Sequence, residues 1–363
     1  MAETLLRVED LKTQFFTQRG VVKAVDGVSL HVDEGETLGV VGESGCGKTM
    51  TALSILRLLP DPGRIVSGRI WFRDKEVTKM DDDQIRNFRG NDVAMIFQDP
   101  MTSMNPVTKV GAQIEEAMTA HDRFSAREAR DRVVPLLKRV RIPAAERRVS
   151  DYPHQFSGGM RQRGMISMGL ANEPALLIAD EPTTALDVTV QAQIIQLLKQ
   201  LNRELGTAIM LITHNMALVA SLCSRVVVMY AGRVVEEGPI EQIFDSPQHP
   251  YTWALLRSVP RVDEARKERL VSIRGLPPDL VRLPPGCKFH PRCAFRIDRC
   301  DKEEPPLEAV AAGQKARCWV LMRNVPEEAT RELRAAEISK AAAAEIKKVT
   351  AAEEKAEERL GEG

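Results

Sequence analysis

The sequence predicts an α/β fold in which helices cover a mostly parallel, doubly wound β-sheet. Short runs of β-branched and aliphatic residues alternate with stretches compatible with helices, a rhythm that is typical of βαβ units. A glycine-rich segment at 42–49 lies between one of these runs and a helical stretch. The apolar runs are strand-sized and fall short of the roughly 18 residues that a membrane span needs. We therefore expect a globular chain that does not cross a membrane by itself.

The expected elements follow one another in a regular order. Strands are expected at residues 37–41, 93–97, 175–179 and 208–213, and helices at 49–59, 190–205 and 216–223. Helical stretches dominate between 100 and 170, and the density of prolines after 246 excludes long helices there. The sequence thus predicts four parts: an α/β core at 1–99 and 171–245, a helical insertion at 100–170, a proline- and cysteine-rich extension at 246–325, and a charged, alanine-rich tail at 326–363.

The composition excludes several classes of protein. The 363 residues carry 51 Lys and Arg against 51 Asp and Glu, so the formal net charge is zero, which argues against a strongly basic nucleic-acid-binding protein. A hydrophobic fraction of 43% is ordinary for a globular chain. The first ten residues include acidic side chains and no continuous apolar stretch, so they do not form a secretory signal. We expect the protein to stay in the cytosol.

The segment at 42–49 predicts a phosphate-binding loop. It reads GESGCGKT and matches G-x-x-x-x-G-K-[ST] in the strand–helix context that this motif needs. Glycines let backbone N–H groups approach phosphate oxygens, and the following helix points the positive end of its dipole at the same anion. Lys48 is expected to reach the β- and γ-phosphates, and the Thr49 hydroxyl to ligate Mg2+. The predicted nucleotide contacts here are Gly42, Glu43, Ser44, Gly45, Cys46, Gly47, Lys48 and Thr49.

A pair of carboxylates, Asp180 and Glu181, directly follows the apolar run ALLIA. Because the carboxyl ends of parallel strands line the ligand crevice of such a sheet, both acids are expected beside the phosphates. Asp180 is expected to hold Mg2+, directly or through water, and Glu181 to act as the general base on the attacking water. The alternative is that both are solvated acids at the end of a strand.

Further motifs resemble those of one family. Residues 156–163 read FSGGMRQR, which resembles the LSGGQ signature of ABC-type ATPases, although Phe156 and Met160 replace the usual Leu and Gln. Gln98 in IFQDP is similar to the Q-loop glutamine, and His214 in LITHNM is similar to the switch histidine. The segment Ala185, Leu186 and Asp187 is similar to the D-loop of the same family.

This resemblance implies a fold, a ligand and an assembly. The fold is the ABC cassette of the P-loop NTPases, with a RecA-like parallel core, an antiparallel edge and a helical subdomain. The ligands are ATP and Mg2+, the latter held by Thr49, Gln98 and Asp180, and the activity is ATP hydrolysis with Glu181, Gln98 and His214 as catalytic residues. Phe15 is expected to stack on the adenine. Two cassettes would lie head to tail, so that Ser157, Gly158 and Gly159 of one chain touch the γ-phosphate held by the other, and Asp187 is a further expected nucleotide contact.

The C-terminal segments SPQHPYTWALLRSVP and PPGCKFHPRCAFRIDRC resemble the extension of ATPase subunits from oligopeptide/dipeptide-type ABC importers. That family implies two membrane permease subunits, a second ATPase subunit that is a sister chain or a second copy, and an extracytoplasmic solute-binding protein. It also implies a peripheral location on the cytoplasmic side of the inner membrane and no nucleic-acid partner. The alternatives are a soluble ABC-type ATPase that is not coupled to transport, and an importer of nickel or another small solute.

Four cysteines, Cys287, Cys293, Cys300 and Cys318, cluster in this extension. Four thiolates can hold Zn2+ or an iron–sulfur cluster, but the spacing lacks the C-x2-C pairs of common zinc ribbons. Because the resembled family implies a 4Fe-4S cluster, we expect iron–sulfur, with Zn2+ or reduced structural thiols as the alternatives.

Overall fold

The protein is described by a computed structural model, which covers residues 3–99, 103–121, 123–184, 186–257, 273 and 275–330. An eight-stranded sheet with the order β11-β12-β10-β9-β3-β8-β7-β6 forms its centre, and a four-stranded antiparallel sheet with the order β2-β1-β4-β5 packs beside it. Strands β9, β3, β8, β7 and β6 are parallel, whereas β10, β12 and β11 are antiparallel. The predicted parallel core is therefore confirmed.

The strands are β1 (Thr4–Thr17), β2 (Gly20–Asp33), β3 (Thr37–Val41), β4 (Gly63–Phe72), β5 (Lys75–Glu76), β6 (Val93–Ile96), β7 (Leu176–Asp180), β8 (Ala208–Thr213), β9 (Arg225–Tyr230), β10 (Arg233–Pro239), β11 (Glu308–Ala311) and β12 (Gln314–Ala316). The helices of the described ranges include α1 (Lys48–Ile55), α2 (Asp82–Asn87), α4 (Val110–Thr119), α5 (Ala126–Arg139), α6 (Ala145–Arg148), α7 (Gly158–Gly169), α8 (Val188–Leu205), α9 (Met216–Leu222), α10 (Ile240–Asp245) and α11 (Pro250–Arg257).

Both faces of the large sheet are covered, and the side chains of its strands alternate between them. Leu38 and Val40 of β3 belong to the core beside the four-stranded sheet and α1, whereas Val41 belongs to the core under the helices on the opposite face. In β8, Met210 and Leu211 divide in the same way. This alternation explains why the strands read as continuous apolar runs, because neither side meets water.

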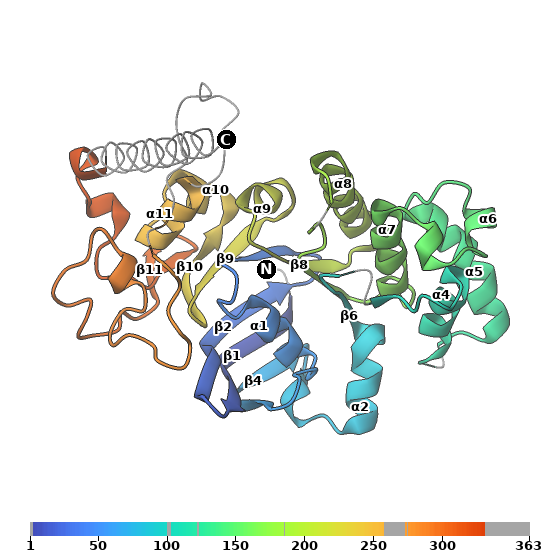
Figure 1. Cartoon of the computed structure of the whole chain (residues 1–363), viewed down its shortest axis with the longest axis horizontal. Helices are drawn as coiled ribbons and strands as arrows, with labels where there is room; N and C mark the ends of the chain where they lie inside the picture. Colours follow the sequence, from blue (N-terminus) through green and yellow to red (C-terminus); the bar gives the residue numbers. More distant parts are fainter. Residues whose placement is uncertain are drawn as a thin grey trace, which may run out of the picture.

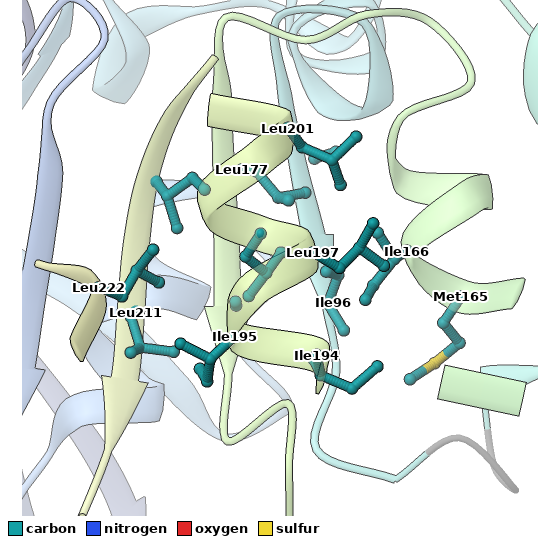
Figure 2. Packing of buried hydrophobic residues seen from close by; sticks show 14 of the residues in the cluster. Ile96, Met165, Ile166, Leu177, Ile194, Ile195, Leu197, Leu201, Leu211 and Leu222 are labelled. Atoms are coloured by element: carbon teal, nitrogen blue, oxygen red, sulfur yellow. The ribbon is translucent and has the colours of Figure 1, made fainter. Parts of the chain in front are cut away.

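Helix α8 supplies much of the core on the helical face. Figure 2 shows Leu197 directed toward Ile166 of α7 and Ile96 of β6, and Ile194 directed toward Met165 of α7, while Ile195 lies near Leu211. All of these side chains are at most 4% exposed. The helix therefore fixes α7, and with it the motif at 157–159, against the parallel sheet.

The helical segment and the C-terminal extension lie at opposite ends of the long axis of the molecule (Figure 1). Helices α4 to α7 form the first, between β6 and β7, as the sequence predicts. The extension begins with the eight-residue α11 and ends in the hairpin β11–β12, which joins the central sheet through β10. The extension thus shares a sheet with the core, which its proline-rich composition did not predict.

Helix α1 is shorter than expected. It ends at Ile55 instead of residue 59, because Arg57 adopts a φ of 52° and the Leu58 N–H donates to the carbonyl of Leu53 (2.8 Å), which closes the helix. No helix within the described ranges is both long and apolar enough to span a membrane. Of the predicted tail, residues 331–363 lie outside the described part of the chain, as does Ala185 of the predicted D-loop.

Candidate nucleotide-binding site

A cavity of about 900 Å³ opens at the carboxyl ends of the parallel strands. Most of the predicted contacts meet there, although they come from segments far apart in the sequence. It is lined by Phe15, Val22, Ala24, Gly42, Glu43, Ser44, Gly45, Gly47, Lys48, Thr49, Met50, Gln98, Glu181, His214, Leu255, Ile273 and Leu280. Of the predicted loop contacts, Cys46 alone is absent from this lining; its side chain is 5% exposed, and burial raises the pKa of its thiol.

The loop at 42–49 requires glycine at two positions. Gly42 has a φ of 155°, and a Cβ there would lie 2.2 Å from the carbonyl oxygen of Met229. Gly47 has a φ of 102°, and a Cβ there would lie 2.2 Å from the carbonyl oxygen of Ala24. Both glycines therefore let the loop pack against β9 and β2 while it curls at the start of α1.

Lys48 is the first residue of α1, and its side chain is directed back over the loop. Its Nζ donates to the carbonyl oxygens of Gly42 (2.8 Å) and Glu43 (3.0 Å). Thr49 follows at the cavity wall and hydrogen-bonds the carboxyl of Asp180, which ends β7. Burial raises the pKa of Asp180, while the Thr49 hydroxyl and the Lys48 charge oppose that rise.

Three side chains converge on the carboxylate of Glu181. His214 Nδ1 lies 3.1 Å from Oε1, the Thr184 hydroxyl donates to Oε2 (2.9 Å), and Gln98 Nε2 donates to Oε2 at 3.4 Å. Gln98 follows β6, Glu181 follows β7 and His214 follows β8. The sheet therefore brings together the three residues predicted to be catalytic, and Thr184 adds a contact that the sequence did not indicate.

The backbone and the charge of Glu181 are both constrained. Its φ of 46° is rare for a residue with a side chain, and its N–H donates to the carbonyl of Ile212 in β8 (2.8 Å). Burial raises the pKa of Glu181, but hydrogen bonds from His214 and Thr184 outweigh it and hold the pKa below its usual range. The carboxylate is therefore ionised at neutral pH.

The signature residues lie elsewhere. Ser157 caps the N-terminus of α7, accepting from the Met160 N–H (3.4 Å), and Gly158 and Gly159 form its first turn. Asp187 caps α8 by accepting from the Val190 N–H (2.9 Å). None of these four lines the cavity. They share one region instead, because a Cβ at Gly159 would lie 2.8 Å from Val190 Cγ1.

Phe15 lines the cavity, as predicted, and its ring lies against Gly63, where a Cβ would come within 2.5 Å of it. Sequence reasoning missed the cavity residues that the C-terminal extension supplies, namely Leu255, Ile273 and Leu280. The motif in the extension marked a family likeness, but nothing in its composition indicated that it returns to the phosphate-binding loop.

The four clustered cysteines are not joined in disulfides. Cys287 donates its backbone N–H to the carbonyl of Cys300 (2.8 Å), and the four thiols are close enough to influence one another's ionisation. Burial raises the pKa of Cys293 to about 12 and that of Cys318 further. In the described ranges, no three or more His, Cys, Asp or Glu side chains are arranged to hold a metal ion. The thiol arrangement therefore does not support the predicted iron–sulfur or Zn2+ site.

Two family models match the chain. The ABC transporter model matches residues 25–184, and the model of the oligopeptide/dipeptide transporter C-terminal region matches residues 235–300. Curated relatives include a probable peptide ABC transporter ATP-binding protein of Sinorhizobium fredii, 51% identical over 88% of this chain and 95% of the relative. Another is the oligopeptide transport ATP-binding protein OppD of Bacillus subtilis, 46% identical over 93% of this chain and 95% of the relative.

Solved structures agree with the fold. A dimeric ATP-binding cassette in a post-hydrolysis state bound to ADP and Pi is 27% identical, with a TM-score of 0.58 over 65% of this chain and 98% of that one. A cassette of an ABC transporter complex from Clostridium perfringens is 29% identical, with a TM-score of 0.58 over 67% of this chain and 91% of that one. The chain belongs to the ATP-binding cassette family of ABC transporters, in the branch that carries the oligopeptide/dipeptide C-terminal region.

Proposed function

We propose that this chain is the ATP-hydrolysing motor subunit of an ABC importer for di- and oligopeptides. The observation that carries the proposal is the carboxylate of Glu181, held by Gln98, Thr184 and His214 at the wall of the phosphate-loop cavity. An ionised carboxylate at that place is suited to accept a proton from an attacking water.

The phosphate-binding loop would receive the triphosphate. Backbone N–H groups of the loop and the N-terminus of α1 offer a positive end to an anion. Lys48 Nζ, which donates to two carbonyl oxygens of the same loop, would exchange these partners for phosphate oxygens. Phe15 at the cavity wall would meet the base.

The residues around Asp180 fit the Mg2+ that the family implies. Its Oδ1 atom is buried and has no hydrogen-bond partner among the described residues, and buried carboxylate oxygens are costly unless they are paired or bind a cation. Asp180, the Thr49 hydroxyl and Gln98 would hold the ion. When bound, Mg2+ neutralises charge on the β- and γ-phosphates.

Glu181 would accept a proton from the attacking water, and its neighbours would orient the Glu181 carboxylate. Thr184 and Gln98 both donate to Oε2, whereas His214 alone contacts Oε1, which leaves a lone pair on Oε1 for the water proton. Because Gln98 joins β6 to the helical segment and also reaches Glu181, a shift of that segment would move a group that touches the base.

A second cassette would complete the site. Ser157, Gly158 and Gly159 form a helix N-terminus outside the cavity of their own chain, and such a terminus is suited to an anion. In a head-to-tail pair, each chain would present this terminus to the partner's γ-phosphate. The second cassette is a sister subunit or a second copy of this chain.

Transport is inferred from the relatives. Those named above are described as peptide and oligopeptide transport ATP-binding proteins, and the C-terminal match at 235–300 belongs to the same class. We infer two membrane permease subunits, a solute-binding protein outside the membrane, and a peripheral position on the cytoplasmic side of the inner membrane. These relatives favour peptide transport over a soluble ABC-type ATPase and over an importer of nickel.

Affinity capture from mildly solubilised membranes tests the transport assignment. The tagged chain is expected to retain two polytopic permeases, a second cassette and a solute-binding protein, all identified by mass spectrometry. The control is the tag expressed alone and captured from the same membranes. Recovery of only ribosomal or DNA-repair proteins would contradict transport.

An iron–sulfur cluster at the four cysteines stays a prediction, with Zn2+ as its alternative. It rests on the family resemblance and on the clustering of Cys287, Cys293, Cys300 and Cys318 in the sequence, whereas the described side chains include no metal-binding arrangement. Anaerobic purification followed by iron, sulfide and zinc analysis decides the matter. A protein that contains none of the three has reduced structural thiols.

A further inference from the structure

The C-terminal extension contacts the phosphate-binding loop directly, and it does so at Glu43. The carboxylate of Glu43 accepts from Arg292 Nη1 on Oε2 (2.5 Å) and from Nη2 on Oε1 (2.9 Å), a bidentate ion pair. The Glu43 backbone N–H donates to the Tyr251 hydroxyl (2.8 Å). Its carbonyl oxygen accepts from Lys48 (3.0 Å). The Cys46 N–H also donates to this carbonyl (3.3 Å), so two of these four groups, Arg292 and Tyr251, come from the extension.

Arg292 is itself fixed. Its side chain is 5% exposed, and that of Glu43 is 22% exposed. Nη1 lies 3.4 Å from the Tyr230 hydroxyl, Nη2 donates to the carbonyl of Gly275 (3.2 Å), and the guanidinium lies 5.8 Å from the centre of the Tyr230 ring. Because several groups hold the planar guanidinium of Arg292, its two hydrogen bonds restrict the Glu43 carboxylate to one orientation.

The same extension continues along the cavity wall. Leu280 accepts a backbone hydrogen bond from the Lys23 N–H in β2 (3.1 Å). Leu255, Ile273 and Leu280 line the cavity together with Phe15. The segment from 275 to 292 therefore lies beside the nucleotide site. It contacts β2 through Leu280 and the phosphate-binding loop through Arg292.

We propose that Arg292 is a positioning residue of the nucleotide site, which acts through Glu43 to fix the start of the phosphate-binding loop and to neutralise its carboxylate. The loop must receive a triphosphate, and an uncompensated carboxylate within it would repel that anion. Loss of Arg292 would leave Glu43 partly buried, charged and without its guanidinium. This inference rests on the proposed ATP-binding function and deepens it.

Binding of Mg2+ and ATP to the full chain, measured by isothermal titration calorimetry, tests the inference. Arg292→Gln is expected to raise the Kd for ATP about tenfold, since coupled charged pairs contribute on this scale. Arg292→Gln combined with Glu43→Gln is expected to return to within about threefold of the parent, because the repelling charge is gone. A residue that served folding alone would show no such recovery.

Arg299→Gln is the matched control. It removes an ion pair with Glu303 in the same extension (2.7 Å), but between side chains that are more than half exposed and outside the cavity lining. Its Kd is expected to equal that of the parent. A folded Arg292→Gln chain with the parental Kd would overturn the inference, and so would a double variant as weak as the single one.

Two further measurements keep the outcomes distinct. If Arg292→Gln does not fold, Arg292→Lys takes its place, because it keeps the charge and loses the fork; a rise of about threefold supports the inference and a parental Kd overturns it. Failure of the parent chain itself to bind ATP would contradict the proposed function instead, since the inference depends only on differences between variants that start from a binding-competent parent.

Discussion

Glu181 is the residue on which the proposed chemistry depends, and its surroundings explain how it stays ionised. Its backbone is held in a left-handed conformation by the N–H bond to Ile212, so the side chain cannot relax into a common strand-end position. His214 and Thr184 then stabilise the charged form of the carboxylate. Strain at this position is tolerated because the neighbouring strands determine it.

Glu181→Gln is expected to lower ATP turnover about 10²- to 10⁴-fold, the range that a positioned general base contributes. The amide keeps the shape and still occupies the cavity wall, so ATP binding should persist. Phosphate release and equilibrium ATP binding are measured on the same preparation. Glu241→Gln, an exposed glutamate of α10, is the control. Turnover at the parental rate in Glu181→Gln would exclude this residue as the base.

The residues that the sequence could predict are those with strict local demands. Gly42 and Gly47 have to be glycine because the backbone of β9 or β2 lies where a Cβ would be. The phosphate-binding motif specifies glycine at both positions, so the sequence alone predicts them. Arg292 carries no comparable signal. Its partner Glu43 is 249 positions away, and an arginine among prolines and cysteines does not show which carboxylate it will meet.

At the scale of elements, the N-terminus of α7 is the clearest functional feature that its own chain does not use. Ser157→Arg places a large cation where the partner's phosphate would dock. ATP binding to the chain's own loop is expected to remain, whereas hydrolysis in the assembled transporter should fall to background. Ser150→Arg, at another exposed serine of the helical segment, is the control. Normal hydrolysis by Ser157→Arg would contradict the head-to-tail assembly.

The junction between β10 and α11 contains a buried histidine that makes stability depend on pH. His249 is 1% exposed, and its Nδ1 accepts from the Tyr251 N–H (3.0 Å). Burial, aided by the charge of Arg317, lowers the pKa of His249 from 6.5 to about 3. Below pH 6.5 His249 binds a proton in the unfolded chain but not in the folded chain. The free energy of unfolding therefore decreases as the pH falls from 6.5 toward about 3.

This effect is isolated by comparing His249→Asn with the parent, since the amide oxygen can replace the Nδ1 acceptor. From pH 7 to pH 5, the parent should lose about 2 kcal/mol more unfolding free energy than the variant. Urea denaturation of both proteins at pH 7 and pH 5 measures these unfolding free energies. Burial raises the pKa of the neighbouring Glu236, which acts with the opposite sign but is common to both proteins. Equal losses would show that His249 does not titrate in this way.

Across the whole molecule, the α/β order was predictable and the course of the extension was not. Parallel strands such as β3 and β8 are short, apolar and separated by amphipathic helices, so they are visible locally. Strand β12 has three residues and pairs with β10 from nearly 80 positions away. The division of the chain at 100, 170, 245 and 325 stays a prediction. At 245 the proposed boundary separates β10 from β12, although the two strands pair in one sheet.

One buried carboxylate shows what that shared sheet means. Glu236 of β10 is fully buried, and it accepts from the N–H groups of Gln248 (2.6 Å) and His249 (2.9 Å) and from the Gln314 side chain (2.8 Å). All three donors come from beyond residue 245. A recombination event that joined this cassette to an unrelated tail at that position would leave the buried carboxylate of Glu236 without these hydrogen-bond donors. A cassette joined to another tail at that position is therefore expected to lose stability unless Glu236 is replaced as well.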